Sequence, residues 1–211
     1  MTRVYLEEGR TKIVACALDW PGWARIGTTE DRAVAALTTY ADRYRLIAAS
    51  AGLSFDPGPI EIVETVTGVN TTDWGAPGVP VAEDSQPYGA AAAERTATIL
   101  QTAWRALDDL ARSAPETLRK GPRGGGRDRD EIVAHAVDTE RAYARKIGIR
   151  HRPFAAHDRT ALTALRTAIL DVLGNPADGA PLTRDGWPPA YAARRFAWHV
   201  LDHVWEIEDK S

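Results

Sequence analysis

The chain has little of what would place it in several large classes of protein. It has one cysteine, Cys16, in 211 residues, so it can form no internal disulfide and is no disulfide-bonded scaffold. It lacks any apolar run of about 18 residues, and charged residues follow Met1 where a secretory leader would be apolar. We therefore expect a cytoplasmic protein without a membrane partner.

An excess of either charge is also missing. The 26 Lys and Arg residues and the 29 Asp and Glu residues leave a formal net charge of −3, and both signs are spread along the chain. Domains that bind nucleic acid usually concentrate a basic excess, so we expect no nucleic-acid partner. What is present, 44% hydrophobic and 26% charged residues, is typical of a globular protein with a buried core.

Residues 1–70 have the pattern of a small α/β module. Apolar-rich segments over 4–8 and 12–18 flank a hairpin-length connection, and further extended segments follow over 24–26 and 60–66. Between the last two, apolar residues repeat at helical spacing as far as Gly52, which predicts one amphipathic helix of about six turns. We therefore expect antiparallel strands and one helix.

Glycine and proline residues interrupt the pattern between Gly68 and Gly89, which predicts a linker over residues 71–86. Beyond it, four segments repeat apolar residues at helical spacing, over roughly 90–113, 129–147, 158–173 and 188–208. Four amphipathic helices bury their apolar faces best on one another, so we expect a four-helix bundle over residues 87–211. The predicted fold class is thus α+β.

Three histidines are predicted to point into this bundle. His199 and His203 lie four residues apart on one helix face, with about 6 Å between their Cβ atoms. His135 lies on the apolar side of the second predicted helix. Three neutral imidazoles would bind a divalent metal and leave an open coordination position; zinc or nickel fits best, and iron or manganese stays open. The alternative is a set of hydrogen-bonded core histidines, because HxxxH arises easily by chance.

Carboxylates lie three residues from each histidine, where they could orient an imidazole: Asp138, Asp202 and Glu206. The alternative for each is a solvated carboxylate on a helix surface. Trp198 and Trp205 flank the histidine pair but are offset around the helix, so we expect them to pack against neighbouring helices or the other domain rather than line the site.

A basic segment over residues 119–129 joins the first two predicted helices of the bundle. Its Arg123 and Arg127 could clamp an anionic substrate above the metal, and its run of glycines would let it move as a lid. The alternative is a solvated, flexible loop without a ligand.

The last predicted helix carries a resemblance to a known family. Residues 194–209 read RRFAWHVLDHVWEIED, and with His135 they resemble the DinB/YfiT-like superfamily of metal-binding four-helix proteins over roughly residues 84–211. The resemblance implies that His135, His199 and His203 bind a divalent metal. It also implies thiol-dependent transferase or isomerase chemistry, with mycothiol or bacillithiol as the thiol in some members. It names no substrate.

The N-terminal part resembles a second family. Residues 16–33 read CALDWPGWARIGTTEDRA and resemble the HicB-like small domain, with a strand, a D-x-P-G-x turn, a short strand and a helix start. The resemblance implies a partial double-stranded-RNA-binding-like α/β fold. The DNA-binding tail usual in that family is absent here, so only the fold and a role in protein interaction carry over.

Two functions from different classes therefore stay open. The first is a divalent-metal protein that acts on a small molecule as a mycothiol-type thiol-dependent transferase or isomerase. The second is a non-catalytic interaction protein whose N-terminal module binds a protein partner; a homodimer is compatible with both. A cavity that opens on the three histidines would favour the enzyme, whereas histidines closed over by side chains would favour the interaction protein.

Overall fold

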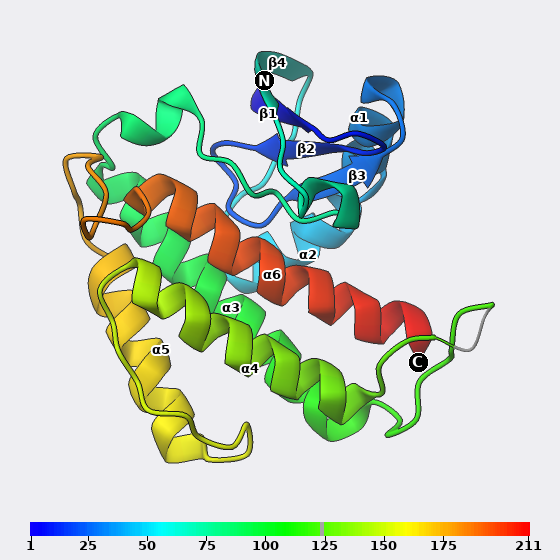
Figure 1. The fold of residues 1–211 in the computed structure, drawn as a ribbon. Helices are drawn as coiled ribbons and strands as arrows, with labels where there is room; N and C mark the ends of the chain where they lie inside the picture. The colour runs from blue at the N-terminus through cyan, green and yellow to red at the C-terminus, as the bar shows by residue number, and fades with distance from the viewer. Residues whose placement is uncertain (123–124) are drawn as a thin grey trace.

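The N-terminal residues form a four-stranded sheet, and the residues that follow it are mostly helical (Figure 1). The structure is a computed structural model that describes residues 1–122 and 125–211. The sheet has the order β3-β2-β1-β4, and its strands are β1 (Thr2–Glu8), β2 (Ile13–Ala17), β3 (Ala24–Gly27) and β4 (Ile60–Thr67). The mixed α/β class and the four predicted strand segments are confirmed.

The fourth strand corrects the expectation of a purely antiparallel sheet. β2 pairs antiparallel with both β1 and β3, but β4 pairs parallel with β1, with Val4 opposite Ile62. The direction of β4 follows from the connection before it. Because β3 runs in the same direction as β1, a helical crossover from β3 brings the chain back to start β4 in that direction too.

Two helices replace the single helix of six turns. α1 (Glu30–Thr39) and α2 (Ala41–Ser50) meet at Tyr40, which lies outside both. The hydroxyl groups of Thr38 and Thr39 each donate a hydrogen bond to the backbone carbonyl four residues earlier, at 2.9 Å. Such bonds bend a helix, and here they lie directly before the break. The apolar repeat continues through Tyr40, so the hydrophobic pattern alone does not reveal the break.

Two short 3-10 helices, η1 (Thr72–Trp74) and η2 (Ala82–Ser85), lie in the predicted linker. This segment is fastened to the sheet through Glu7, a buried residue of β1. Its carboxylate accepts hydrogen bonds from the backbone N–H groups of Gly78 and Val79, at 2.8 and 2.9 Å. The segment therefore lies against the sheet, and the domain boundaries on either side of it remain a prediction.

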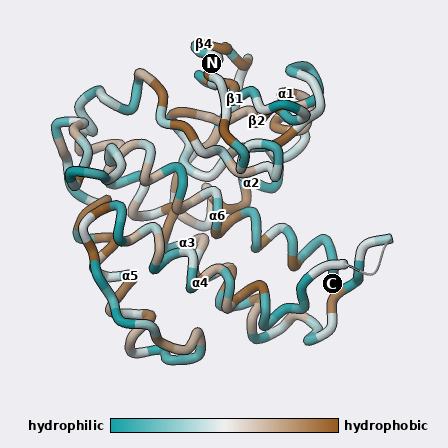
Figure 2. Tube along the Cα trace, viewed as in Figure 1, coloured by the Kyte–Doolittle hydropathy of each residue, from teal (hydrophilic) through white to brown (hydrophobic). Residues whose placement is uncertain are grey.

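Four helices follow, close to the predicted segments: α3 (Ala90–Ser113), α4 (Arg129–Lys146), α5 (Arg159–Leu173) and α6 (Pro189–Lys210). Each of the four contacts the other three. Hydrophilic and hydrophobic residues alternate around their turns, as amphipathic helices require (Figure 2). None of the described helices combines the length and the apolar composition needed to cross a membrane.

α6 lies between the sheet on one side and α3, α4 and α5 on the other (Figure 1), and most of its residues are buried. One hydrophobic core joins both parts of the chain across it, since Leu6 and Trp23 belong to the same buried cluster as Leu100, Phe196 and Leu201. A helix packed from two sides has little freedom to rotate or shift. The side chains that α6 presents to its neighbours are therefore held in fixed positions.

Candidate metal centre

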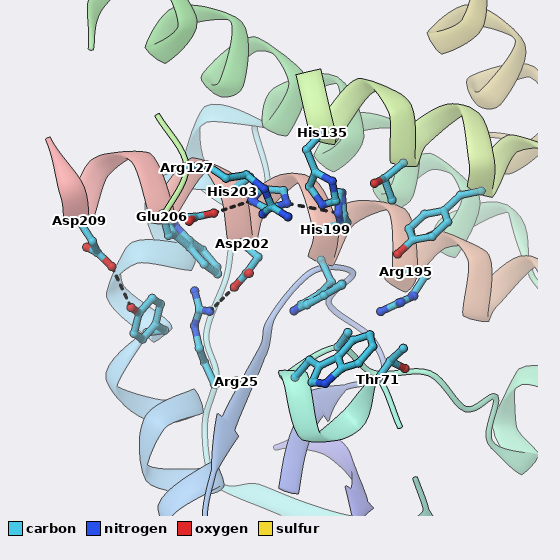
Figure 3. A pocket seen from close by; sticks show the side chains of 17 residues that line it. Arg25, Thr71, Arg127, His135, Arg195, His199, Asp202, His203, Glu206 and Asp209 are labelled. Atoms are coloured by element: carbon cyan, nitrogen blue, oxygen red, sulfur yellow. Dashed lines mark hydrogen bonds and ion pairs between the residues drawn. The ribbon is translucent and has the colours of Figure 1, made fainter. Parts of the chain in front are cut away.

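Three imidazoles meet where α4 packs against α6. His135 reaches from α4 toward His199 and His203 of α6 (Figure 3), and one nitrogen of each ring lies within 4.8 Å of the other two. The Nε2 atoms of His199 and His203 are 3.3 Å apart. The spacing of four residues puts these two rings one helical turn apart on a single face. The structure thus brings together the three histidines that the sequence singles out.

Burial favours the neutral form of His199 and His135. His199 and His203 are each 6% exposed, and His135 is half-buried. Burial lowers the pKa of His199 well below its ordinary value, and the neighbouring His203 and His135 lower it further. Burial is also the main reason why the pKa of His135 is lowered. A neutral imidazole keeps the lone pair that a metal ion needs, so the rings are prepared as ligands.

Glu206 orients the His203 ring. Nδ1 of His203 lies 2.8 Å from the Glu206 carboxylate, which can only accept, so Nδ1 carries a proton and Nε2 is the nitrogen available to a metal ion. This hydrogen bond from His203, together with one from Lys210, lowers the pKa of Glu206 to about 2. A carboxylate behind a histidine is the usual arrangement around a ligating imidazole.

The hydrogen bonding of His199 fits a cation between the rings. Its Nδ1 is buried without a partner among the described residues, while its Nε2 faces the lone pair of His203. With either tautomer, one nitrogen of the His199 ring lacks a hydrogen bond, and such a buried group calls for an explanation. The 3.3 Å between the Nε2 atoms matches the ~3.3 Å expected for two nitrogen ligands in a tetrahedral zinc site.

The other two predicted carboxylates face arginines. Asp202 accepts a hydrogen bond from Nη1 of Arg25 at 2.8 Å, and Asp138, which is largely exposed, pairs with Arg141 at 3.0 Å. Of the three acidic residues, Glu206 is the one that the structure places in contact with an imidazole. Spacing of three residues brings a carboxylate near a histidine, but a long arginine side chain nearby competes for it.

The histidines line a cavity of about 610 Å³ (Figure 3). One side of it belongs to α4 and α6. The opposite side comes from the N-terminal part of the chain: Arg25, Tyr40, Thr71, Trp74 and Ala76. Sequence analysis does not assign these five residues to the site, because nothing in the local pattern shows that the sheet and the η1 segment face the histidines.

Arginines surround this cavity. Of the two loop arginines that the sequence singles out, Arg127 is exposed and lines the cavity, whereas Arg123 lies outside the described residues. Two further arginines, Arg25 and Arg195, also line it. Arg195 has a signal in the sequence, because it lies four residues before His199 and so on the same face of α6. Arg25 has no such signal in the sequence, because its position depends on a contact with Asp202, which lies 177 residues away in the chain.

Trp198 and Trp205 pack against the N-terminal part of the chain, as expected, but they do not avoid the site. Both line the cavity. The Trp198 ring lies 5.8 Å from the His199 ring, and the Arg25 guanidinium stacks over Trp205 at 4.3 Å. The reason is that the N-terminal part closes the cavity from the side, so residues offset from the histidine face reach its wall.

The site can hold one cation on three neutral nitrogen ligands, beside a cavity large enough for a small molecule. Three arginines and three carboxylates line that cavity. Arg25 pairs with Asp202, so Arg127 and Arg195 are the arginines there without an ion pair among the described residues, and they would attract an anion. Comparisons of this chain with protein-family models, with curated proteins and with solved structures find no match.

Proposed function

We propose that this chain is a divalent-metal protein that uses an external thiol in transferase or isomerase chemistry. In this proposal α3 to α6 form a DinB/YfiT-like four-helix bundle, and the sheet with α1 and α2 forms a HicB-like module in front of it. One observation carries the proposal: three buried or half-buried imidazoles, within 4.8 Å of one another, line a cavity. Zinc or nickel suits three imidazoles best, with iron and manganese as competitors.

The cavity favours this enzyme over a non-catalytic interaction protein. About 610 Å³ lies within the range of small-molecule sites, and the space opens on the imidazoles. Histidines that served only to fill a core would be covered by packed side chains, since protein interiors leave few voids. The N-terminal part supplies one wall of the cavity, which gives this module a role in substrate binding.

In this chemistry His135, His199 and His203 would hold the ion, and Glu206 keeps the His203 ring in its ligating tautomer. When bound, the ion supplies Lewis acidity that lowers the pKa of a thiol or of water. The one cysteine of the chain, Cys16, is buried and does not line the cavity, so the thiol must come from outside. Arg127 at the cavity would attract an anionic thiol.

Metal content tests the first half of the proposal. We expect about one divalent ion per purified chain, and His199→Ala or His203→Ala should lose most of it because each removes one of three ligands. His157→Ala is the matched control, since His157 is exposed and lies outside this cluster. Elemental analysis that finds no metal after expression in supplemented medium, together with no uptake on titration, would overturn the site.

Thiol binding tests the second half. Calorimetry with mycothiol, or a close analogue, should show binding to the metal-loaded protein and none to His199→Ala. With an anionic thiol such as 3-mercaptopropionate, Arg127→Gln should weaken thiol binding while the metal content stays unchanged, because Arg127 contributes charge and no metal ligand. No binding at millimolar thiol would remove the transferase proposal and leave a metal-binding protein.

A further inference from the structure

Arg195 is a buried arginine to which the described residues offer no carboxylate. It is 9% exposed, and its Nε and Nη1 atoms are shielded from solvent without a hydrogen-bond partner. The preceding residue shows the usual solution: Arg194, which is 7% exposed, pairs with Asp84 through both Nη atoms at 2.7 Å. Burying a guanidinium without an anion is unfavourable, so Arg195 calls for a partner that the chain itself does not supply.

Aromatic rings hold the Arg195 guanidinium in place. Its central carbon lies over the Trp198 ring at 4.8 Å and over the Tyr143 ring at 5.1 Å from the centroids. Contacts with ring faces offset part of the desolvation. They do not satisfy the N–H groups, which point outward in the guanidinium plane. A planar acceptor can meet one edge of the guanidinium and so satisfy one of the two unpaired nitrogens, and a carboxylate has that shape.

Other unsatisfied donors gather around the same cavity. Ten buried side-chain atoms of the described residues lack a hydrogen-bond partner, and five of them belong to residues that line it: two each on Arg25 and Arg195, and Nδ1 of His199. These residues come from β3 and from α6, far apart in sequence. The carboxylates that line the cavity already have cations, since Asp202 pairs with Arg25, Glu206 with Lys210 and Asp209 with Arg43. Among the described residues Arg195 is therefore left as a buried lining cation without an anion.

We propose that Arg195 is the receptor for a carboxylate of the ligand that reaches the three histidines. The proposal rests on the proposed function and gives it a substrate class. Arg195 and His199 are one helical turn apart on one face of α6, with about 6 Å between their Cβ atoms. A short ligand therefore reaches both groups. The class is a small acid in which a thiol or another metal-binding atom lies a few bonds from a carboxylate.

The experiment compares two thiols that differ only in charge. Metal-loaded full-length protein is titrated by calorimetry with 3-mercaptopropionate and with the neutral 3-mercaptopropionamide. We expect the acid to bind at least about 30-fold more tightly than the amide, as for a buried charge pair. In Arg195→Gln, the affinity for the acid should fall to the affinity for the amide. The metal content and the melting temperature of this variant should stay close to those of the wild type.

Arg159→Gln is the matched control, because it removes the same charge from an exposed arginine of α5 and should keep the preference for the acid. Arg195→Lys, which retains the charge and the long stem, should keep only part of the preference; it also serves if Arg195→Gln does not fold. A wild-type protein that holds metal yet binds acid and amide equally overturns this proposal alone, as does an Arg195→Gln protein that keeps the preference. A wild-type protein without metal overturns the proposed function and this proposal with it.

Discussion

The two kinds of reactive side chain in this molecule, imidazole and thiol, have opposite environments. The three histidines line an open cavity, whereas Cys16 packs in the sheet against Tyr5 and Val14. Burial raises the pKa of the Cys16 thiol to about 12, against a hydrogen bond with Tyr5 that lowers it. The Cys16 thiol is therefore protonated at neutral pH and is a core side chain, as the sequence predicts.

The raised pKa of Cys16 makes the stability of the fold depend on alkaline pH. The folded protein holds the thiol proton more tightly than the unfolded chain, so stability is complete below about pH 9 and falls as the pH rises toward 12. The slope reaches about 1.4 kcal/mol per pH unit. Cys16→Ala should reduce the loss between pH 9 and 10; buried tyrosines, whose pKa is also raised by burial, account for the remainder because they begin to titrate in the unfolded chain over the same range. Urea unfolding at both pH values checks this, and equal losses in the two proteins would contradict it.

At the scale of elements, a buried ion cluster ties three helices together. Arg166 of α5 lies 3.2 Å from both Glu140 of α4 and Asp108 of α3, and the Glu140 side chain is 1% exposed. Burial raises the pKa of Glu140, while Arg166 opposes this effect. The cluster adds contacts on the far side of α4 from the histidine site and helps to set the helix that carries His135.

Removing one member of this buried cluster should lower the free energy of unfolding far more than breaking an exposed ion pair. Arg166→Ala leaves Glu140 buried without its cation, so we expect a loss of about 3–5 kcal/mol in the free energy of unfolding. Arg112→Ala, which breaks the exposed pair with Asp109, should cost less than about 1 kcal/mol. Arg166→Met combined with Glu140→Met should recover most of the loss. Urea denaturation measures all three, and equal effects of the two alanine variants would refute the argument.

The turn between β2 and β3 sets how closely the sheet approaches α6. Gly22 has φ +92°, and a Cβ there would lie 2.7 Å from Cδ1 of Leu201 and 3.0 Å from the backbone of Ala197. Gly52 also has a positive φ, +72°, but a Cβ there meets nothing within 4 Å. Gly22→Ala should therefore destabilise the fold by at least about 1 kcal/mol more than Gly52→Ala, which isolates the close approach from backbone strain. Thermal unfolding of the two variants measures this difference. Equal losses of stability would show that the chain around Gly22 can shift to make room for a Cβ.

At the scale of the whole molecule, α6 is common to both parts of the chain. One buried cluster includes Leu6 of the sheet, Tyr44 of α2 and Leu201 of α6, and the histidine cavity has walls from both parts. The site is therefore complete only when the N-terminal part is folded against α6. A boundary drawn at the linker divides the sequence by composition, whereas the core continues across it.

This shared core predicts that the full chain unfolds in one transition. Leu201→Ala should lower the melting temperature by several degrees and should reduce amide protection in β1 as much as in α3, since the cavity it leaves is shared. Circular dichroism and tryptophan fluorescence should give the same midpoint, and hydrogen exchange measures the amide protection in β1 and α3. Two separate transitions, or a loss of protection confined to the helices, would instead support two independent folding units.

The amino-acid sequence by itself determined the features that depend on local spacing. The four long helices and the shared face of His199 and His203 follow from periodicity, because residues three or four apart meet on a helix. The same spacing offers Asp138, Asp202 and Glu206 to the histidines, and only the structure shows that Glu206 makes the contact. The periodicity did not predict the break between α1 and α2 at Tyr40, because the apolar repeat continues through this residue.

Only the tertiary structure decided the features that depend on distant segments. The parallel pairing of β4 and the wall of the cavity that includes Arg25 and Trp74 arise from contacts between residues far apart in the chain. The unpaired state of Arg195 has the same origin, because a buried charge is recognised only when every neighbour around it is known. Packing across the core sets these contacts, and no local spacing records it.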